Sequence, residues 1–320
     1  MGVFCYSNLY RAYRKCRLGV AWKGSTQKFI TQAPLEVFRI WDKLDKGIWK
    51  SKGFYEFDSF ERGKARHIKS VNIDERVVQR CLCDNALVPV LQPTFIFDNG
   101  ASTKDKGYHF ATSRCEKHLH DHYRKYGQNG YVLTFDFSKF FDNVDHQLIE
   151  EIMLNNFTDQ KIIALTMYPV HAFGDKGLGL GSQVSQTFAL ASANRLDHYC
   201  KEVLQIHGYG RYMDDGYLIS ESKEHLQSCL ECIQKICDQL HITLNTKKTR
   251  ITKLSKGFTF LKCRFFLIDT GKVVKKIYKK SVTKMRRKLK KFQTMYLDGI
   301  LIYQDGMPGI PKRAFIRCAL

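Results

Sequence analysis

The chain of 320 residues is long enough to bury the core of one large domain or of two closely packed ones, and its hydrophobic fraction of 44% is typical of folded proteins. Lys and Arg number 52 against 31 Asp and Glu, a formal net charge of +21 that indicates a polyanionic partner such as nucleic acid. No stretch approaches the roughly 18 consecutive apolar residues of a membrane span, and the N-terminal residues lack the pattern of a signal peptide. We therefore expect a cytoplasmic protein with no membrane partner.

The first half of the chain changes in composition at about residue 130. Residues 1–65 are basic and aromatic, include a helical stretch at residues 33–44, and match no motif, so we expect them to bind a specific RNA or partner. Residues 66–130 combine a helical run, a loop rich in glycine and lysine, and a further helix. A strand-like apolar run then begins at Tyr131 and is followed by helical periodicity.

The second half alternates helices with strands. A loop with four glycines, between residues 173 and 183, leads into a helix of small side chains. Two apolar runs then meet at Asp214 and Asp215, as in a β-hairpin. Another helix, a turn and strand-like segments follow, and a basic amphipathic helix begins near Ser281. This alternation predicts an α+β fold with a central sheet.

The eleven cysteines are an odd number in a chain without a secretory signal, so we do not expect a disulfide framework. Cys229, Cys232 and Cys237 are as closely spaced as zinc ligands, but the apolar residues around them recur at helical spacing. No second Cys/His pair follows at zinc-finger spacing. We expect reduced thiols packed in and around a helix.

Three aspartates occupy positions that a fold normally avoids. Asp136 lies inside an apolar strand, where a lone carboxylate is costly unless a cation or hydrogen bonds compensate it. Asp214 and Asp215 form a like-charge pair that a metal ion would relieve. Each feature has an ordinary alternative, since Asp-Asp-Gly is a common turn sequence and Asp136 could cap a strand. Together they predict one site that binds two Mg²⁺ ions, or Mn²⁺ as a substitute, for phosphoryl transfer.

The motifs around these aspartates carry a family resemblance. The palm motifs of reverse transcriptases resemble five segments of this chain, in the family's order: residues 135–146 (FDFSKFFDNVDH), 177–186 (GLGLGSQVSQ), 212–215 (YMDD), 244–249 (LNTKKT) and 257–265 (GFTFLKCRF). YMDD alone is a weak signal because four residues recur by chance, whereas the whole series is specific. The resemblance covers residues 66–265.

This resemblance implies an α+β right-hand polymerase fold. The expected parts are an N-terminal extension (1–65), fingers (66–130), a palm (131–265), and the end of the primer grip with the thumb (266–320). The palm should be an antiparallel sheet packed on helices, and the thumb a short basic helical segment. The implied ligands of the two ions are Asp136, Asp214, Asp215 and the main-chain carbonyl of Phe137.

The resemblance also implies a nucleotide site. Phe141 corresponds to the aromatic gate that excludes a 2′ hydroxyl, which implies deoxynucleoside triphosphate substrates and a DNA product. Its alternative role is core packing, which we expect Phe140 to fulfil on the opposite face. Further contacts are expected from Leu180, Gly181, Ser185 and Gln186 in the nucleotide loop, Lys104 and Lys106 in the fingers, and Lys248 near the pyrophosphate. Arg66 or Arg76 could replace the fingers lysines, and Lys248 could instead be a surface residue.

Template RNA and the primer or cDNA strand are the implied macromolecular ligands. Contacts with them are expected from Tyr212, Met213, Phe260, Leu261, Lys284, Arg286, Arg287, Lys288, Lys290 and Lys291. The last six belong to the basic helix, which resembles a thumb that follows the duplex backbone. A plain amphipathic surface helix is the alternative.

The nucleotide loop distinguishes subgroups of the family. Many reverse transcriptases have Gln before the loop glycine and Pro after its serine, whereas this chain has Leu180 and Gln186. This form is similar to the error-prone enzymes of diversity-generating retroelements of bacteria and phages, which implies a small basic accessory protein as a further partner. A polar group that could orient the nucleotide is lost at Leu180, and fidelity should fall with it. The alternatives are a retron-like or phage-defence reverse transcriptase, and a catalytically dead scaffold that binds RNA.

Overall fold

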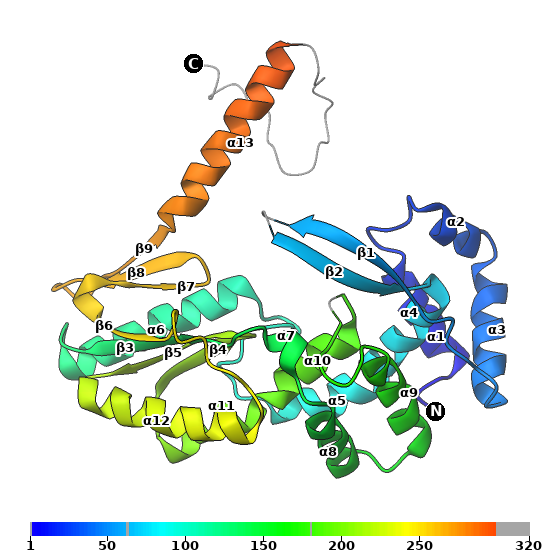
Figure 1. Cartoon of the computed structure of the whole chain (residues 1–320), viewed down its shortest axis with the longest axis horizontal. Helices are drawn as coiled ribbons and strands as arrows, with labels where there is room; N and C mark the ends of the chain where they lie inside the picture. The colour runs from blue at the N-terminus through cyan, green and yellow to red at the C-terminus, as the bar shows by residue number, and fades with distance from the viewer. Residues whose placement is uncertain (1, 62–63, 180, 299–320) are drawn as a thin grey trace.

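The computed structural model describes residues 2–61, 64–179 and 181–298. Its largest sheet among these residues is four-stranded and antiparallel and is here called the central sheet; it lies in the left part of Figure 1. The strand order is β4–β5–β3–β6, with β3 at Tyr131–Asp136, β4 at Gly208–Tyr212, β5 at Asp215–Ser220 and β6 at Arg250–Lys253. Nearly every residue of β3 and β5 is buried, which requires that both faces of the sheet be covered.

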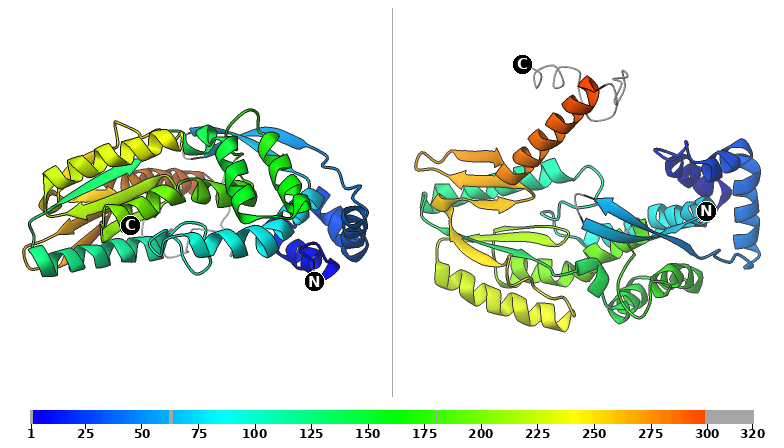
Figure 2. Two further views of the ribbon diagram at one scale, coloured as in Figure 1. Left: turned by 90° about the horizontal axis from the view of Figure 1, so that it is seen from below. Right: turned by 45° about the horizontal axis from the view of Figure 1, so that its top comes forward.

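Two helices cover the two faces of this sheet (Figure 2). Helix α12, Lys223–Gln239, packs Leu226 and Ile233 into the main core together with Leu133 of β3. Helix α6, Tyr108–Tyr126, packs on the other face, where Leu119 shares a second core with Val132. The alternation of side chains along β3 thus sends neighbouring apolar residues into two different cores.

The main core continues into a helical layer beyond the sheet. Three helices of this layer lie between Asp136 and the glycine-rich loop, and three follow that loop. They are α7 (Phe140–Asn143), α8 (His146–Asn156), α9 (Gln160–His171), α10 (Gln183–Ser192), α11 (Asn194–His198) and the π-helix η3 (Tyr199–Val203). Asp145 and Asp159 cap α8 and α9, because their carboxylates accept hydrogen bonds from first-turn N–H groups.

The N-terminal helices do not form a separate unit. The helices α1 (Tyr6–Cys16), α2 (Gly24–Thr31) and α3 (Ala33–Asp45) share a core with α4 (Ile73–Leu82). Strands β1 (Phe54–Glu61) and β2 (Lys64–Val71) pair along their whole length as one hairpin. The expected boundary at residue 65 therefore cuts through a hydrogen-bonded hairpin and is not a domain boundary. A π-turn η1 (Cys83–Leu87), α5 (Val88–Leu91) and a 3₁₀ turn η2 (Gln92–Thr94) continue α4.

The C-terminal part consists of a second sheet and a projecting helix (Figure 1). After the 3₁₀ turn η4 (Leu254–Lys256), strands β7 (Phe258–Phe260), β8 (Cys263–Leu267) and β9 (Val273–Ile277) form a three-stranded antiparallel sheet. The expected boundary at residue 265 falls inside β8. The expected boundary at residue 130 also differs from the structure, because α6 packs on the central sheet rather than on the β1–β2 hairpin.

Helix α13, Lys279–Leu297, is described in full and has no buried side chain. Val282, Leu289 and Phe292 are only partly exposed, whereas its lysines and arginines are exposed. This agrees with the amphipathic basic helix expected from Ser281 onward. Residues 299–320, the rest of the expected thumb, lie outside the described residues.

The cysteines in the described part of the chain are free thiols, and Cys229 and Cys237 are buried along α12 as the helical spacing predicted. Among the described residues, no helix combines the length and apolar character needed to cross a membrane.

Candidate active site

The three aspartates meet at one end of the central sheet because of the strand register. The antiparallel pairing of β3 with β5 sets Asp136 opposite Asp215. Asp214 lies in the two-residue turn between β4 and β5, and its carbonyl accepts a hydrogen bond of 2.9 Å from the N–H of Phe137. Phe137 therefore contacts the turn through its N–H group, and the expected role of its carbonyl as a metal ligand stays a prediction.

Gly216 is part of a strand rather than of the turn. It is the second residue of β5 and lies opposite Phe135 in the register. A Cβ atom at Gly216 would lie 2.2 Å from the nearest Phe135 ring atom, so no larger residue fits unless the ring moves. Only Asp214 of the Asp-Asp-Gly sequence lies in the turn, and packing against Phe135 explains the glycine.

Burial and mutual repulsion raise the pKa values of the two hairpin carboxylates. Burial and the charges of Asp214 and Asp136 raise the pKa of Asp215 to about 7, although the main-chain amide of Leu261 and the Lys248 ammonium act in the opposite direction. Burial and Asp136 also raise the pKa of Asp214. A bound cation would relieve both effects, and carboxylate oxygens are the ligands that Mg²⁺ and Mn²⁺ prefer. The residues therefore fit the expected metal ions.

Lys248 supplies a positive charge to this cluster. Its Nζ lies 2.7 Å from Oδ1 and 2.8 Å from Oδ2 of Asp136. Asn245 Nδ2 also donates to Asp136 Oδ2, at 3.4 Å. Burial lowers the pKa of Lys248, but the hydrogen bond and the charge of Asp136 outweigh it, so the net direction is upward. The Lys248 side chain is exposed, and it also contacts a residue of the candidate site.

In this conformation, no three His, Cys, Asp or Glu side chains of the described residues are arranged to hold a metal ion. The ammonium of Lys248 contacts both carboxylate oxygens of Asp136, and a metal ion bound to either oxygen would have to compete with it. Of the three aspartates predicted as metal ligands, Asp136 is the one whose carboxylate forms an ion pair with a lysine in the described part of the chain.

The two phenylalanines after the catalytic strand differ in burial. Phe140 is 5% exposed and belongs to the main core, as expected. Phe141 is partly exposed at the edge of that core, with its ring 6.0 Å from the Phe140 ring. Its carbonyl accepts a hydrogen bond of 2.6 Å from the N–H of Leu178. The candidate gate residue therefore links the catalytic strand to the glycine-rich loop.

The nucleotide loop is built around Gly181 and the start of α10. Gly181 has a φ of +102°, a backbone conformation that favours glycine. Ser182 caps α10 by accepting a hydrogen bond from the Ser185 N–H. The side chain of Ser185 is 1% exposed, so the expected direct nucleotide contact is wrong for this conformation. Gln186 is exposed and bonded to Ser102, and Leu180 lies outside the described residues.

The two lysines expected to contact the triphosphate, Lys104 and Lys106, lie in the loop that precedes α6. Lys106 donates a hydrogen bond of 2.7 Å to the Phe97 carbonyl and lies over the rings of Phe97 and Phe110, while Lys104 is exposed in the same loop. This loop runs beside β4, since the N–H of Gly100 donates to the Arg211 carbonyl, and its Ser102 hydroxyl donates to Gln186 on α10. Lys106 is held by its own aromatic neighbours and does not match the expected triphosphate contact.

Another set of basic residues borders the nucleotide loop. A cavity of about 300 Å³ separates the β1–β2 hairpin and α4 from Gly181, Ser182 and Gln183. Its cationic side chains are Lys23, Lys69, Arg76 and Arg80. Of the alternatives left open by the sequence, Arg76 has this position; the side chain of Arg66 lies outside the described residues.

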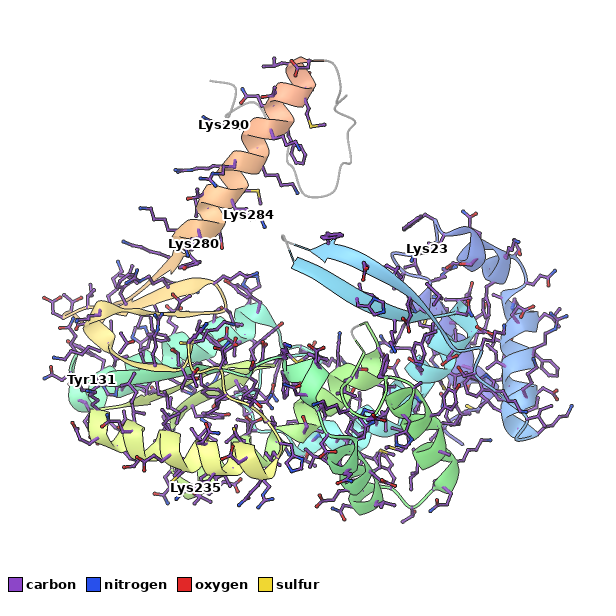
Figure 3. All side chains as sticks on the ribbon, viewed as in Figure 1. Lys23, Tyr131, Lys235, Lys280, Lys284 and Lys290 are labelled. Atoms are coloured by element: carbon purple, nitrogen blue, oxygen red, sulfur yellow. The ribbon has the colours of Figure 1, made fainter. Side chains whose placement is uncertain are left out.

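The expected nucleic-acid residues divide into exposed and buried groups. Phe260 is 1% exposed and packs its ring 4.8 Å from that of Tyr217, so it is a core residue and not a contact. Leu261 forms the tip of the β7–β8 hairpin, and Tyr212 and Met213 lie at the β4–β5 turn; all three are partly exposed. The six expected cations of α13 are exposed; Figure 3 labels two of them, Lys284 and Lys290, together with Lys280 on the same helix.

Sequence reasoning missed a buried ion pair next to the β4–β5 turn. Arg211 and Asp197 are both fully buried, and Arg211 also donates a hydrogen bond of 2.8 Å to the carbonyl of Met213. The available signal was an arginine inside the apolar run of β4, two residues before the turn. We infer that this pair positions the turn that carries Asp214.

Comparisons with known proteins agree with this arrangement. A sequence model of the family described as "Reverse transcriptase (RNA-dependent DNA polymerase)" matches residues 49–265. Among solved structures, apo telomerase from Candida tropicalis has a TM-score of 0.54 at 14% identity, over 74% of this chain and 52% of that chain. A form of the same telomerase truncated from its C-terminal domain has a TM-score of 0.53 at 14% identity, over 70% of this chain and 55% of that chain.

Telomerase from Candida albicans, in complex with a TWJ fragment of telomeric RNA, has a TM-score of 0.53 at 11% identity, over 78% of this chain and 51% of that chain. The chain spans about half the length of these telomerases, and the likeness confirms the predicted right-hand polymerase fold. No curated protein sequence matches it. The match over residues 49–265 shows that the chain belongs to the reverse transcriptase (RNA-dependent DNA polymerase) family, whose enzymes are nucleotidyltransferases.

Proposed function

We propose that this chain synthesises DNA on an RNA template by metal-dependent nucleotidyl transfer from deoxynucleoside triphosphates. The observation that carries the proposal is the cluster of Asp136, Asp214 and Asp215, brought together by the register of β3 and β5. Family membership supports the reaction type. The raised pKa values of Asp214 and Asp215 support a site that is completed by cations.

Each group around the cluster has a proposed task. Two Mg²⁺ ions, when bound, would stabilise the charge on the attacking and leaving oxygens, and the three aspartates would hold them. Phe141 would lie under the sugar and exclude a 2′ hydroxyl. Gly181 would let the main chain approach the nucleotide, and Arg76 would bind its phosphates from the neighbouring cavity.

The product duplex would be held by the second sheet and by α13. Leu261, at the tip of the β7–β8 hairpin, lies beside Asp215 and would support the primer end. The exposed lysines and arginines of α13 would neutralise backbone phosphates without reading sequence.

A primer-extension assay tests the proposal. The purified chain would receive Mg²⁺, deoxynucleoside triphosphates and a primed RNA template. We expect extension by the unchanged chain and by Asp238→Asn, which alters an exposed aspartate on α12, and loss of extension in Asp214→Asn Asp215→Asn. Equal extension by the double variant would contradict the assignment of the site, and no extension on any primed template would favour the scaffold alternative.

We further propose that the chain is the error-prone enzyme of a diversity-generating retroelement, encoded by a bacterium or a phage. It would act in the bacterial cytoplasm, together with a small basic accessory protein. The support is the sequence of the nucleotide loop, Leu180 to Gln186. Sequencing of the cDNA tests this proposal: errors concentrated at template adenines are expected, and Leu180→Gln should reduce them. Faithful copying would favour the retron-like or phage-defence alternative.

A further inference from the structure

The Asp136 carboxylate already has a cation from the chain itself. Both of its oxygens lie within 2.8 Å of the Lys248 ammonium, while only 11% of the Asp136 side-chain surface is exposed. A Mg²⁺ or Mn²⁺ ion would bind at least one of the same oxygens. An ammonium that bridges both oxygens and a divalent cation bound to either of them would lie close together and repel each other, so the two compete for Asp136.

The turn that carries Lys248 is anchored to Asp136 through the main chain. The N–H of Asn245 donates a hydrogen bond of 2.8 Å to the carbonyl of Asp136, and the N–H of Lys248 donates one of 3.0 Å to the carbonyl of Asn245. The side-chain carbonyl of Asn245 accepts from the N–H of Lys247, which closes an Asx-type turn. The position of the Lys248 backbone relative to Asp136 is therefore set by hydrogen bonds, not by the ion pair alone.

Within the described residues, only its contacts with Asp136 hold the ammonium of Lys248 at the candidate site. The Lys248 side chain is 60% exposed, so its four-carbon stem can swing into solvent without breaking any core contact. The space that it would enter is a cavity of about 700 Å³ next to Asp136 and Asp215. That cavity is lined by further cations, among them Lys247, Arg250 and Arg264, which would repel a displaced ammonium.

We propose, on the basis of the proposed function, that Lys248 is a built-in counter-ion of Asp136 that a divalent cation must displace before Asp136 can bind it. The ion pair makes the cluster of aspartates less negative in the free protein and so weakens metal binding. A displaced ammonium in the cationic cavity would be stabilised by the phosphates of an incoming nucleotide, which links metal binding to nucleotide binding.

The test is a titration of the free, full-length protein with Mn²⁺, followed by the electron paramagnetic resonance signal of unbound Mn²⁺. We expect Lys248→Met to bind Mn²⁺ more tightly by a factor of about 10, because one competing charge-assisted contact is removed. Lys248→Arg keeps the charge and a two-pronged contact, and should bind no more tightly than the unchanged chain.

Lys247→Met is the matched control. Lys247 is exposed and lines the same cavity, but in the described part of the chain its ammonium pairs with no carboxylate. Its removal measures the general effect of one positive charge, which we expect to be less than about threefold. Asp136→Asn should weaken Mn²⁺ binding and identifies the site.

Equal Mn²⁺ affinities for Lys248→Met and the unchanged chain, or for Lys248→Met and Lys247→Met, would overturn the inference. The titration uses neither template nor nucleotide. A chain that binds Mn²⁺ as expected but extends no primer would therefore contradict the proposed function alone, whereas a chain that extends primers with equal Mn²⁺ affinities would contradict only the role of Lys248.

Discussion

Arg211 and Asp197 form a two-pronged ion pair with no solvent exposure, immediately behind the turn that carries Asp214. Arg211 Nε lies 2.7 Å from Asp197 Oδ1, and Nη2 lies 2.6 Å from Oδ2. The Tyr209 hydroxyl donates to the same carboxylate at 2.6 Å, and the remaining guanidinium nitrogen binds the Met213 carbonyl. The β4–β5 turn is thereby tied to α11 across the main core.

Removal of one partner should destabilise the fold, because it leaves an uncompensated buried charge. We expect Asp197→Asn and Arg211→Met each to lower the free energy of unfolding by about 3–5 kcal/mol. Urea denaturation followed by circular dichroism measures the change. Arg39→Ala, which breaks an exposed pair with Glu36, should cost less than about 1 kcal/mol. A similar small loss in all three variants would show that the buried pair does not stabilise the turn.

The stability of the metal-free protein should depend on pH through Asp215. Its pKa is raised to about 7 in the folded state, so between about pH 4 and pH 7 the unfolded chain has lost a proton that the folded chain keeps. Stability therefore falls as the pH rises through this range. We expect Asp215→Asn to remove about 1–3 kcal/mol of this fall, measured as the free energy of unfolding at several pH values.

The exposed Asp238 gives the control for that experiment. Asp238→Asn should leave the slope of stability against pH as it is in the unchanged chain. If Asp215→Asn and Asp238→Asn give the same slope, the hairpin carboxylate does not hold its proton in the folded state. Added Mn²⁺ should remove the pH effect, since a bound cation favours the ionised carboxylates.

Phe141 should determine discrimination against ribonucleotides. We expect Phe141→Ala to raise the ratio of ribonucleotide to deoxynucleotide use, as kcat/KM, by about tenfold or more. Phe140→Leu is the matched control, because Phe140 is buried and should affect stability without changing that ratio. If Phe141→Ala does not increase ribonucleotide use, Phe141 is not the residue that excludes a 2′ hydroxyl.

The cations on one face of α13 should contribute to duplex binding through counterion release. Lys280, Lys284, Arg287 and Lys291 lie three or four residues apart and share one face of the helix. Their joint replacement by Gln should make the dependence of log K on log salt shallower by about 0.9 for each phosphate that the helix no longer neutralises. Lys235→Gln, on α12 across the central sheet, should leave the slope unchanged (Figure 3). An unaltered slope in the fourfold variant would exclude α13 from the binding surface.

The clustering of Asp136, Asp214 and Asp215 could be inferred from sequence because each aspartate has an unusual local setting. Asp136 ends an apolar strand, and Asp214 and Asp215 join two others, so pairing of adjacent strands brings them together. Local patterns also indicated α12, α13 and the β4–β5 hairpin, since amphipathic periodicity is visible within each segment.

The positions of Lys106, Ser185 and Phe260 could not be inferred in the same way. Lys106 is held by Phe97 and Phe110, Ser185 is buried by the layer around α10, and Phe260 packs on Tyr217. Each outcome depends on residues from other elements, and a motif position alone does not say which side of an element faces solvent.

The sequence by itself determined the family and the fold class and set the three aspartates apart, because motif order, hydrophobic period and isolated charges are local properties of the chain. The tertiary structure alone decided the boundaries between parts, the Arg211–Asp197 pair and the contact between Lys248 and Asp136. Those two pairs join residues 14 and 112 positions apart, and the energy of a charge depends on its burial and on its partner. Only the folded chain sets both.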